Sequence, residues 1–361
     1  MRSAMRKLMG SVILITLLSF SPGYSQVKSV SPSPFGEKEI VTWDYSSKVI
    51  GEDYTIYVHF PPGYDTTKTS YPVLYMTDGD WNMTVAMNCF RMLRQDYLTN
   101  EPLIVGIGYG NRTNKRSRDL EPSTGAPNFI KFIAQEVMPF IQSKYRVTDQ
   151  KALYGYSYGG VFTSYVLFEH PGLFNDIFIG APGNGDLTLR ADKYFATHKE
   201  LKGKIFLGAG SYEPGTVSKI EQFKQYMDQK KLPDLQVLTA VVPSAGHGAA
   251  LAPVMQSGMK FVYCKTHKPF SLTESALKKF TGTFIAGGQN DSLTVYLDKG
   301  SLYLASRNGQ PTQLVPYRVD GLFFYENEKI EINLKEEAGK KYYVINVDGE
   351  KPMQYNQIAG K

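Results

Sequence analysis

Short apolar runs recur along the first two thirds of the chain and are separated by longer, more polar stretches. Each run is only six to nine residues long and ends at or directly before Gly, Pro or Ser, which is typical of buried strands. The runs that predict strands are residues 39–47, 53–61, 71–79, 102–108, 151–156, 176–181, 204–210 and 235–243.

Between several of these runs the apolar residues recur every three or four positions, which predicts helices. The clearest case is residues 128–143, with Ile130, Ile133, Val137 and Ile141 on one face. Similar segments predict helices over 81–98 and 158–169 and after each later strand. Strands that alternate with helices favour an α/β fold with a doubly wound, mostly parallel sheet covered on both faces.

The pattern changes to strict alternation from Ala276 onward. Leu293, Val295 and Leu297 alternate with polar residues, and the Asp-Lys-Gly turn at 298–300 precedes a second alternating run. Alternation broken by Gly and Asp turns is typical of antiparallel strands. We therefore expect an α/β domain over 37–265, a linker over 266–275 and a small all-β domain, a sandwich or barrel, over 276–361.

The first 25 residues have the composition of a secretory signal peptide. A basic start is followed by an apolar run that is short for a membrane span, and small residues lead to an expected cleavage site after Ser25. An uncleaved anchor is the alternative. Residues 26–36 form a Ser/Pro-containing linker. We expect a periplasmic or secreted protein with no membrane span after cleavage.

The distribution of charge and the spacing of the histidines argue against nucleic-acid binding and against a metal site. Three of the positive charges behind the formal net charge of +6 lie in the signal segment, and no basic stripe follows, so no nucleic acid is expected. The five histidines show no metal-site spacing, and no metal or other cofactor is implied. Cys89 and Cys264 could form a disulfide or remain two buried thiols, and the sequence does not decide between these alternatives.

The segment Gly155-Tyr156-Ser157-Tyr158-Gly159 lies between a predicted strand and a predicted helix. This is the context of a nucleophile elbow, in which the serine adopts a positive φ and glycine is needed two residues before and after it. The helix start adds amide N–H groups and partial positive charge, which suits an oxyanion. We interpret Ser157 as a nucleophile.

A serine nucleophile needs a base and an acid, which follow it in the order acid then histidine in this fold class. His247 lies in a small-residue loop after the last apolar strand, where a base would project over the sheet edge. Glu213 lies just past the preceding strand and would orient the imidazole. His59, His170, His198 and His267 fall in a strand, a helix end, a polar connection and the linker.

Two loops supply the expected oxyanion donors, which are the N–H groups of Tyr158 and Asp80. Asp78 and Asp80 lack a third ligand or second acid nearby, which disfavours a metal or glycosidase site. The segment "IVGIGYGN" lacks the third glycine of a dinucleotide fingerprint. Aromatic residues on the site loops are open to two interpretations, an acyl pocket and simple packing: Trp81, Tyr156, Tyr158 and Tyr212.

Several motifs together resemble the esterase-D-like family of α/β-hydrolases: "YPVLYMTDGD", "RSRDLEP", "EVMPFIQSKYRV", "YGYSYGG", "EHPGLF", "FLGAGSYEP" and "GHGAA". The family includes siderophore, feruloyl and acetyl-xylan esterases and mycolyltransferases. The resemblance covers residues 36–264 and implies the same triad and oxyanion donors. It also places Arg116 and Asp119, from an Arg-x-x-Asp loop, near the site, Arg116 as a substrate contact. The tail resembles small β-domains of exported bacterial serine hydrolases.

The leading hypothesis is an exported serine carboxylesterase that acts on a small-molecule or glycan ester through an acyl-enzyme on Ser157. Siderophore, feruloyl-sugar and acetyl-sugar esters all fit the sequence. An acyltransferase of the same superfamily is an alternative. A non-catalytic carbohydrate- or envelope-binding protein is a second alternative, which the complete set of Ser, Glu and His disfavours.

Overall fold

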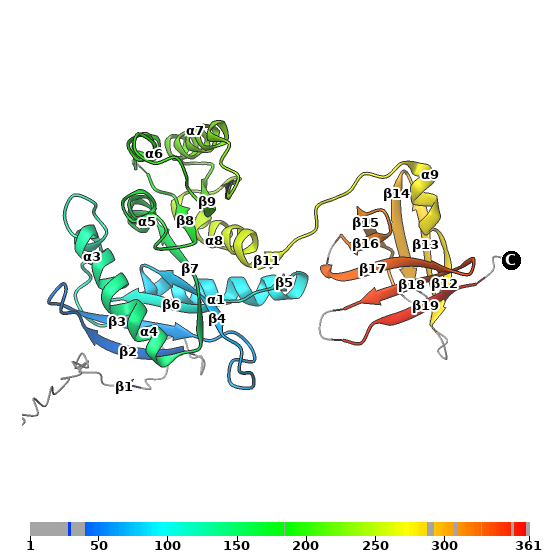
Figure 1. Cartoon of the computed structure of the whole chain (residues 1–361), viewed down its shortest axis with the longest axis horizontal. Coiled ribbons are helices and arrows are strands. Elements are labelled where there is room, and N and C mark those ends of the chain that lie inside the picture. Colours follow the sequence, from blue (N-terminus) through cyan, green and yellow to red (C-terminus); the bar gives the residue numbers. More distant parts are fainter. Residues whose placement is uncertain are drawn as a thin grey trace, which may run out of the picture.

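The computed structural model describes residues 28–29, 40–183, 185–286, 292–306, 309–325, 327–347 and 350–358. The predicted signal peptide lies outside the described residues. The described part contains two separate apolar cores, one formed by residues 40–263 and one by residues 277–355. Figure 1 shows the α/β part and the β-barrel joined by a long connecting segment.

A nine-stranded, mostly parallel sheet forms the centre of the first part, as the alternation of strands and helices predicts. Its first three strands and β6 pair antiparallel, and the remaining pairs are parallel. In spatial order the strands are β1 (Lys28–Ser29), β2 (Ile40–Ser46), β3 (Asp53–His59), β6 (Leu103–Gly108), β4 (Tyr71–Met76), β7 (Val147–Tyr156), β8 (Asp176–Gly180), β9 (Gly203–Gly210) and β10 (Leu235–Val242).

Helices cover both faces of this sheet, because successive residues of a strand point to opposite faces. Phe178 of β8 and Phe206 of β9 lie against Gly258 of α8, whereas Ile177 and Ile205 face α5. Helices α1 (Gly79–Asp96) and α8 (His247–Tyr263) contact each other on one face. The other face carries α3 (Ala126–Phe132), α4 (Met138–Lys144), α5 (Tyr158–Glu169), α6 (Leu187–Phe195) and α7 (Pro214–Lys230).

The helix predicted over 128–143 is interrupted by a π-helical turn, Ile133–Val137, between α3 and α4. Glu136 in this turn is buried and accepts hydrogen bonds from Ser47 Oγ at 2.7 Å and from the N–H of Lys48 at 2.9 Å. The turn thus fastens the helices to the β2–β3 connection. Apolar spacing alone does not reveal such a π turn, because the flanking residues keep the helical period.

The strand order places a topological switch point at β4. The chain runs from β4 to β6 on one side and then returns past β4 to β7 on the other. Helix α1 starts directly after β4, and α5 starts directly after β7. In open α/β sheets ligands bind at the carboxyl ends of the strands at such a point. The starts of α1 and α5 are therefore the place to look for a site.

The C-terminal part is a closed antiparallel barrel, which decides between the two expected β architectures. Each strand pairs with the next, and β12 pairs with β19 to close it. The strands are β12 (Gly282–Ala286), β13 (Ser292–Asp298), β14 (Ser301–Ser306), β15 (Thr312–Arg318), β16 (Gly321–Phe324), β17 (Asn327–Glu337), β18 (Lys340–Asn346) and β19 (Met353–Gln357). A short helix, α9 (Glu274–Leu277), and a 3-10 turn, Lys278–Phe280, precede it.

Two small elements lie near the junction between the parts. β5 (Leu98–Thr99) pairs with β11 (Cys264–Lys265), and the carbonyl oxygen of Arg94, in the last turn of α1, accepts a hydrogen bond from Lys329 Nζ of β17 at 3.0 Å. The remaining short helix, α2 (Arg116–Asp119), follows β6. The barrel therefore contacts the first part at the carboxyl end of α1.

Cys89 and Cys264 are free thiols, and burial raises the pKa of each to about 12. Within the described residues no helix is long and apolar enough to cross a membrane. The same residues contain no group of three or more His, Cys, Asp or Glu side chains that could hold a metal ion.

Replacement of Leu322 by alanine should destabilise the barrel by about 2–5 kcal/mol, because this fully buried leucine of β16 leaves a cavity when it is truncated. The free energy of unfolding in urea measures the loss. Leu189→Ala, at a leucine 48% exposed on α6, is the matched control and should change it by less than about 0.5 kcal/mol. Equal effects of the two variants would contradict the burial of Leu322 in a packed barrel core.

Candidate active site

Ser157 lies at the sharp turn between β7 and α5, with φ 62° and ψ −121°. Its N–H donates to the carbonyl oxygen of Gly180 at 2.9 Å, and its own carbonyl accepts from the N–H of Val161 at 3.0 Å. A non-glycine residue at this φ is strained and persists only when its surroundings impose it. The turn has the backbone geometry that the sequence predicts for a nucleophile elbow.

The flanking glycines are required by the close approach of backbone atoms. A Cβ on Gly155 would lie 2.1 Å from the carbonyl oxygen of Gly159, and one on Gly160 would lie 2.2 Å from that of Gly180. A Cβ on Gly159 would lie 2.5 Å from Thr77 Oγ1. Helix α5 therefore starts in direct contact with the segment that enters α1.

His247 and Glu213 form a direct pair although 34 positions separate them. The Nδ1 atom of His247 lies 2.7 Å from Oε1 of Glu213. Glu213 precedes the first residue of α7 after β9, and His247 is the first residue of α8 after β10, so the parallel pairing of β9 and β10 brings them to one edge. This is the carboxylate–imidazole arrangement that orients a general base.

Tyr156 immediately precedes the candidate nucleophile and contacts both the backbone and the ring of His247. Its hydroxyl donates to the carbonyl oxygen of His247 at 2.7 Å, and the two rings lie 5.2 Å apart. Among the described residues no hydrogen bond joins the Ser157 hydroxyl to His247, and such bonds are often loose in unliganded sites. Tyr156 is only 4% exposed, and its burial raises the pKa of its phenol.

Both expected oxyanion donors lie in the first turn of a helix. Tyr158 opens α5, and Asp80 is the second residue of α1. The first amides of a helix have no acceptor within the helix and lie at the positive end of its dipole. Gly79 allows the start of α1 to pack closely against β6, since a Cβ on Gly79 would lie 2.7 Å from the backbone carbon of Gly106.

The side chain of Asp80 is fully engaged in fixing the start of α1. It accepts hydrogen bonds from the Tyr57 hydroxyl and from the N–H groups of Tyr109 and Gly110, each at 2.8 Å. A Cβ on Gly108 would lie 2.5 Å from its Oδ1 atom. Gly106 and Gly108 of the segment "IVGIGYGN" thus make room for α1, and Gly110 has a positive φ of 58° and lies against Thr55. These contacts explain the three glycines without a dinucleotide.

Arg116 of α2 forms a bidentate ion pair with Asp78. Its Nε lies 2.7 Å from Oδ1 and its Nη2 lies 2.9 Å from Oδ2. The Asp78 carboxylate is 1% exposed, and its hydrogen bonds raise the pKa of the guanidinium. The sequence alone does not reveal this role of Asp78, because its left-handed φ of 57° and its distant partner are properties of the folded chain.

Three aromatic side chains near the elbow are exposed. Trp81 is 42%, Tyr158 43% and Tyr212 70% exposed. Tyr212 lies in the β9–α7 connection, where its N–H donates to the carbonyl of Ala245, two residues before His247. The structure thus brings Trp81, Tyr158 and Tyr212 to the sheet edge that carries the candidate triad, while Tyr156 is buried beneath the imidazole.

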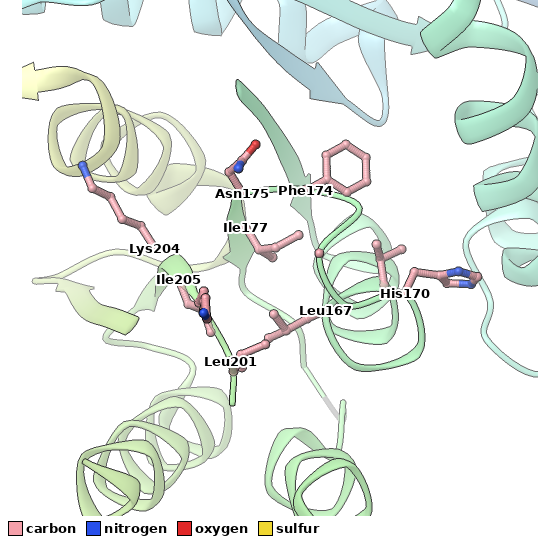
Figure 2. Close-up of a pocket in the computed structure, with 11 residues that line it drawn as sticks. Leu167, His170, Phe174, Asn175, Ile177, Leu201, Lys204 and Ile205 are labelled. Atoms are coloured by element: carbon pink, nitrogen blue, oxygen red, sulfur yellow. The ribbon is translucent and has the colours of Figure 1, made fainter. Parts of the chain in front are cut away.

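The other histidines have structural surroundings. His170 ends α5 at the opposite end from Ser157, and burial lowers its pKa. Figure 2 shows its ring turned away from a small hollow lined by Leu167, Ile177 and Ile205. His198 stacks on Tyr194 with ring centroids 4.2 Å apart. His267 stacks on Phe323 of the barrel, and His59 is buried in β3.

A model of the protein family described as "Putative esterase" matches residues 47–235, just over half of the chain. The chain belongs to this family. The matched segment contains the serine elbow, the Arg116 helix and Glu213, and it ends just before His247. Family membership agrees with the fold and with the resemblance seen in the sequence.

Curated relatives include two fungal siderophore esterases. The chain is 30% identical over 189 residues to siderophore triacetylfusarinine C esterase of Aspergillus fumigatus, a match that covers 45% of this chain and 65% of that protein. It is 28% identical over 180 residues to siderophore enterobactin esterase of Emericella nidulans, covering 41% of this chain and 58% of that protein. The match thus spans less than two thirds of either relative.

Solved structures share the α/β fold. The BES protein from Bacillus cereus matches with a TM-score of 0.55 and 21% identity, over 63% of this chain and 97% of that one. An IroE-like serine hydrolase from Shewanella oneidensis matches with a TM-score of 0.54 and 21% identity, over 62% of this chain and 79% of that one. At this identity the likeness supports the α/β-hydrolase fold alone.

Proposed function

We propose that the protein is an exported serine carboxylesterase in which Ser157 is the nucleophile, His247 the base and Glu213 the acid. The observation that carries the proposal is the 2.7 Å contact between His247 Nδ1 and Glu213 Oε1 beside a serine held at φ 62°. A carboxylate on Nδ1 keeps the proton there, so that Nε2 is free to accept the serine proton. The esterase relatives support the same reaction class.

The chemistry follows from these roles. Ser157 Oγ attacks the ester carbonyl while His247 Nε2 takes its proton, and the carbonyl oxygen becomes an oxyanion. The amides of Asp80 and Tyr158 stabilise this charge at two helix starts. The ester C–O bond then breaks, and His247 protonates the departing alcohol. Water, deprotonated by His247, cleaves the acyl-enzyme, releases the acid and restores the Ser157 hydroxyl.

Ser157→Ala should abolish hydrolysis of p-nitrophenyl acetate while the unfolding transition stays close to that of the parent protein. The nucleophile is removed, whereas the alanine methyl is no larger than the serine side chain. Release of p-nitrophenolate measures the activity. Ser164→Ala, at a buried serine of the same helix α5, is the matched control and should retain activity. Activity of Ser157→Ala at the parental level would contradict the proposal.

We further propose that the acyl part of the ester carries an aromatic group. The support comes from Trp81 and Tyr212, which are exposed and belong to segments at the sheet edge that carries the candidate triad. Exposed aromatic rings supply stacking surfaces for flat ligand groups. Feruloyl sugars share this feature and acetyl sugars lack it. We assign Tyr156 to the support of His247 instead of to substrate contact, since it is buried.

Tyr212→Ala should raise the KM for p-nitrophenyl benzoate about 2- to 10-fold and leave that for p-nitrophenyl acetate nearly unchanged, because one aromatic contact contributes about 0.5–1.5 kcal/mol. Steady-state kinetics with both esters measure the difference. Tyr325→Ala, at a barrel tyrosine of similar exposure, 65%, is the control. Equal changes for benzoate and acetate would remove the aromatic-acyl assignment.

The export part of the proposal rests on the sequence of residues 1–25. In a bacterial host that exports proteins, the purified chain should begin at Gln26, because the short apolar run directs cleavage after Ser25. Intact mass and N-terminal sequencing measure this. Leu14→Arg, which interrupts the apolar run, should leave the leader attached. Recovery of the parent chain from the periplasm or medium with residues 1–25 intact would contradict signal cleavage.

A further inference from the structure

The guanidinium of Arg116 lies at the meeting point of the two helix starts that supply the oxyanion amides. On one side it forms the bidentate pair with Asp78, which immediately precedes α1. On the other side its Cζ atom lies 5.5 Å from the centre of the Tyr158 ring and 5.6 Å from that of Trp81. One side chain therefore touches residues of both α1 and α5.

The contact between Arg116 and Asp78 fixes the position of the Asp80 amide, which lies two residues after Asp78. Asp78 has a left-handed backbone conformation, and its carbonyl accepts from the N–H of Trp81 at 3.2 Å and of Asn82 at 3.0 Å. The direction in which α1 leaves β4 therefore depends on Asp78. A bidentate guanidinium fixes a carboxylate in position and in orientation, which a single point charge does not.

The contact between Arg116 and the Tyr158 ring fixes the position of the Tyr158 amide, because the same residue carries the ring and the N–H donor. The helix starts also touch here, since a Cβ on Gly159 would lie 3.4 Å from Asp78 Oδ2. Arg116 thus lies beside the point where the two helix starts contact each other. Movement of its guanidinium would change the distance between the amides of Asp80 and Tyr158.

Arg116 is itself held on a rigid support. Asp119, one helical turn later in α2, is buried and accepts from the hydroxyl of Tyr54 at 2.7 Å, the hydroxyl of Tyr109 at 2.9 Å and Nε of Arg118 at 2.7 Å. These bonds fasten α2 to β3 and to the segment after β6. The Arg-x-x-Asp motif therefore has two parts, in which Asp119 fixes the helix and Arg116 reaches across to α1.

The same geometry argues against Arg116 as a receptor for substrate charge. The buried carboxylate of Asp78 balances its charge and occupies its Nε and Nη2 donors. An anionic substrate would have to compete with a partner that is already in place and desolvated. These contacts favour a role for Arg116 other than the substrate contact expected from the sequence.

We propose that Arg116 is a positioning residue that holds the amides of Asp80 and Tyr158 at the spacing required to bind the oxyanion. The inference rests on the proposed esterase function and adds to it the device that sets the geometry of the oxyanion site. Its consequence is that loss of Arg116 slows acyl transfer for every ester alike, since every ester forms the same oxyanion.

The test compares Arg116→Gln and Arg116→Lys with the parent protein on p-nitrophenyl acetate and p-nitrophenyl benzoate. We expect kcat to fall on the order of 10- to 100-fold for Arg116→Gln with both esters, with KM changed by less than about threefold, and Arg116→Lys to lie between. Arg112→Gln is the matched control, because Arg112 lies on the same connection but pairs with the exposed Asp44. It should keep parental kinetics.

A second readout separates positioning from simple loss of structure. Phenylboronic acid binds serine hydrolases as a tetrahedral adduct, so its inhibition constant should rise in parallel with the fall in kcat/KM across the Arg116 variants. Asp78→Asn should lower kcat by a similar factor. The double variant Asp78→Asn, Arg116→Gln should be no slower than the worse single variant, because both remove one interaction.

Three outcomes overturn the inference. Parental kcat in a folded Arg116→Gln variant would show that the guanidinium does not set the oxyanion site. A rise in KM confined to the benzoate ester would restore the substrate-contact role. An unchanged affinity for phenylboronic acid would show that the amides have not moved. Failure of the esterase proposal is recognised separately, since the parent protein would then be inactive or Ser157→Ala would be active.

Discussion

Close backbone contact at the turn after β7 is the constraint on which the site depends. The carbonyl oxygens of Gly159 and Gly180 occupy the space that side chains at 155 and 160 would need. The strained φ of Ser157 is sustained by the strand before it, the helix after it and the hydrogen bond to Gly180. The contact also brings α5 against Thr77 and Asp78, so the geometry of one helix start fixes that of the other.

Around this turn every carboxylate has a partner. Asp78 is paired with Arg116, Asp80 accepts three hydrogen bonds, and Glu213 contacts the imidazole. Removal of one member of a buried ion pair such as Asp78–Arg116 costs about 3–5 kcal/mol in known cases, because the other charge stays buried. These acids therefore act on the backbone, on Arg116 and on His247, and the side chains of Trp81, Tyr158 and Tyr212 near Ser157 are exposed. This arrangement favours stacking over charge in the recognition of a substrate.

Much of the fold could be predicted from the sequence because its signals are local. The alternation of strands and helices, the change to period two near residue 276 and the glycines around Ser157 are each visible within a few residues. Glu213 and His247 could be proposed from their order along the chain, since strand ends gather at one edge of a parallel sheet. The structure brings these two side chains together.

The rest depends on contacts between distant residues. The partnership of Arg116 with Asp78, the position of Tyr156 under the imidazole and the closure of the barrel by β12 and β19 leave no periodic trace in the chain. Tyr156 shows the limit clearly. In the sequence, an aromatic residue next to Ser157 fits a place in an acyl pocket as well as a place in the packing. Its burial and its hydrogen bond to the His247 carbonyl, which favour the second role, are visible only in the structure.

The two ends of α1 contact different parts of the molecule, which limits the part that the barrel contact can play at the candidate site. The first turn of this 18-residue helix carries the Asp80 amide, and its last turn accepts the hydrogen bond from Lys329 of the barrel. A helix of this length spans about 27 Å at 1.5 Å per residue. Lys329 therefore contacts α1 near the end of the helix opposite to the Asp80 amide. That barrel contact anchors the far end of α1, and the proposed selection of the acyl group rests on residues of the α/β part, Trp81 and Tyr212.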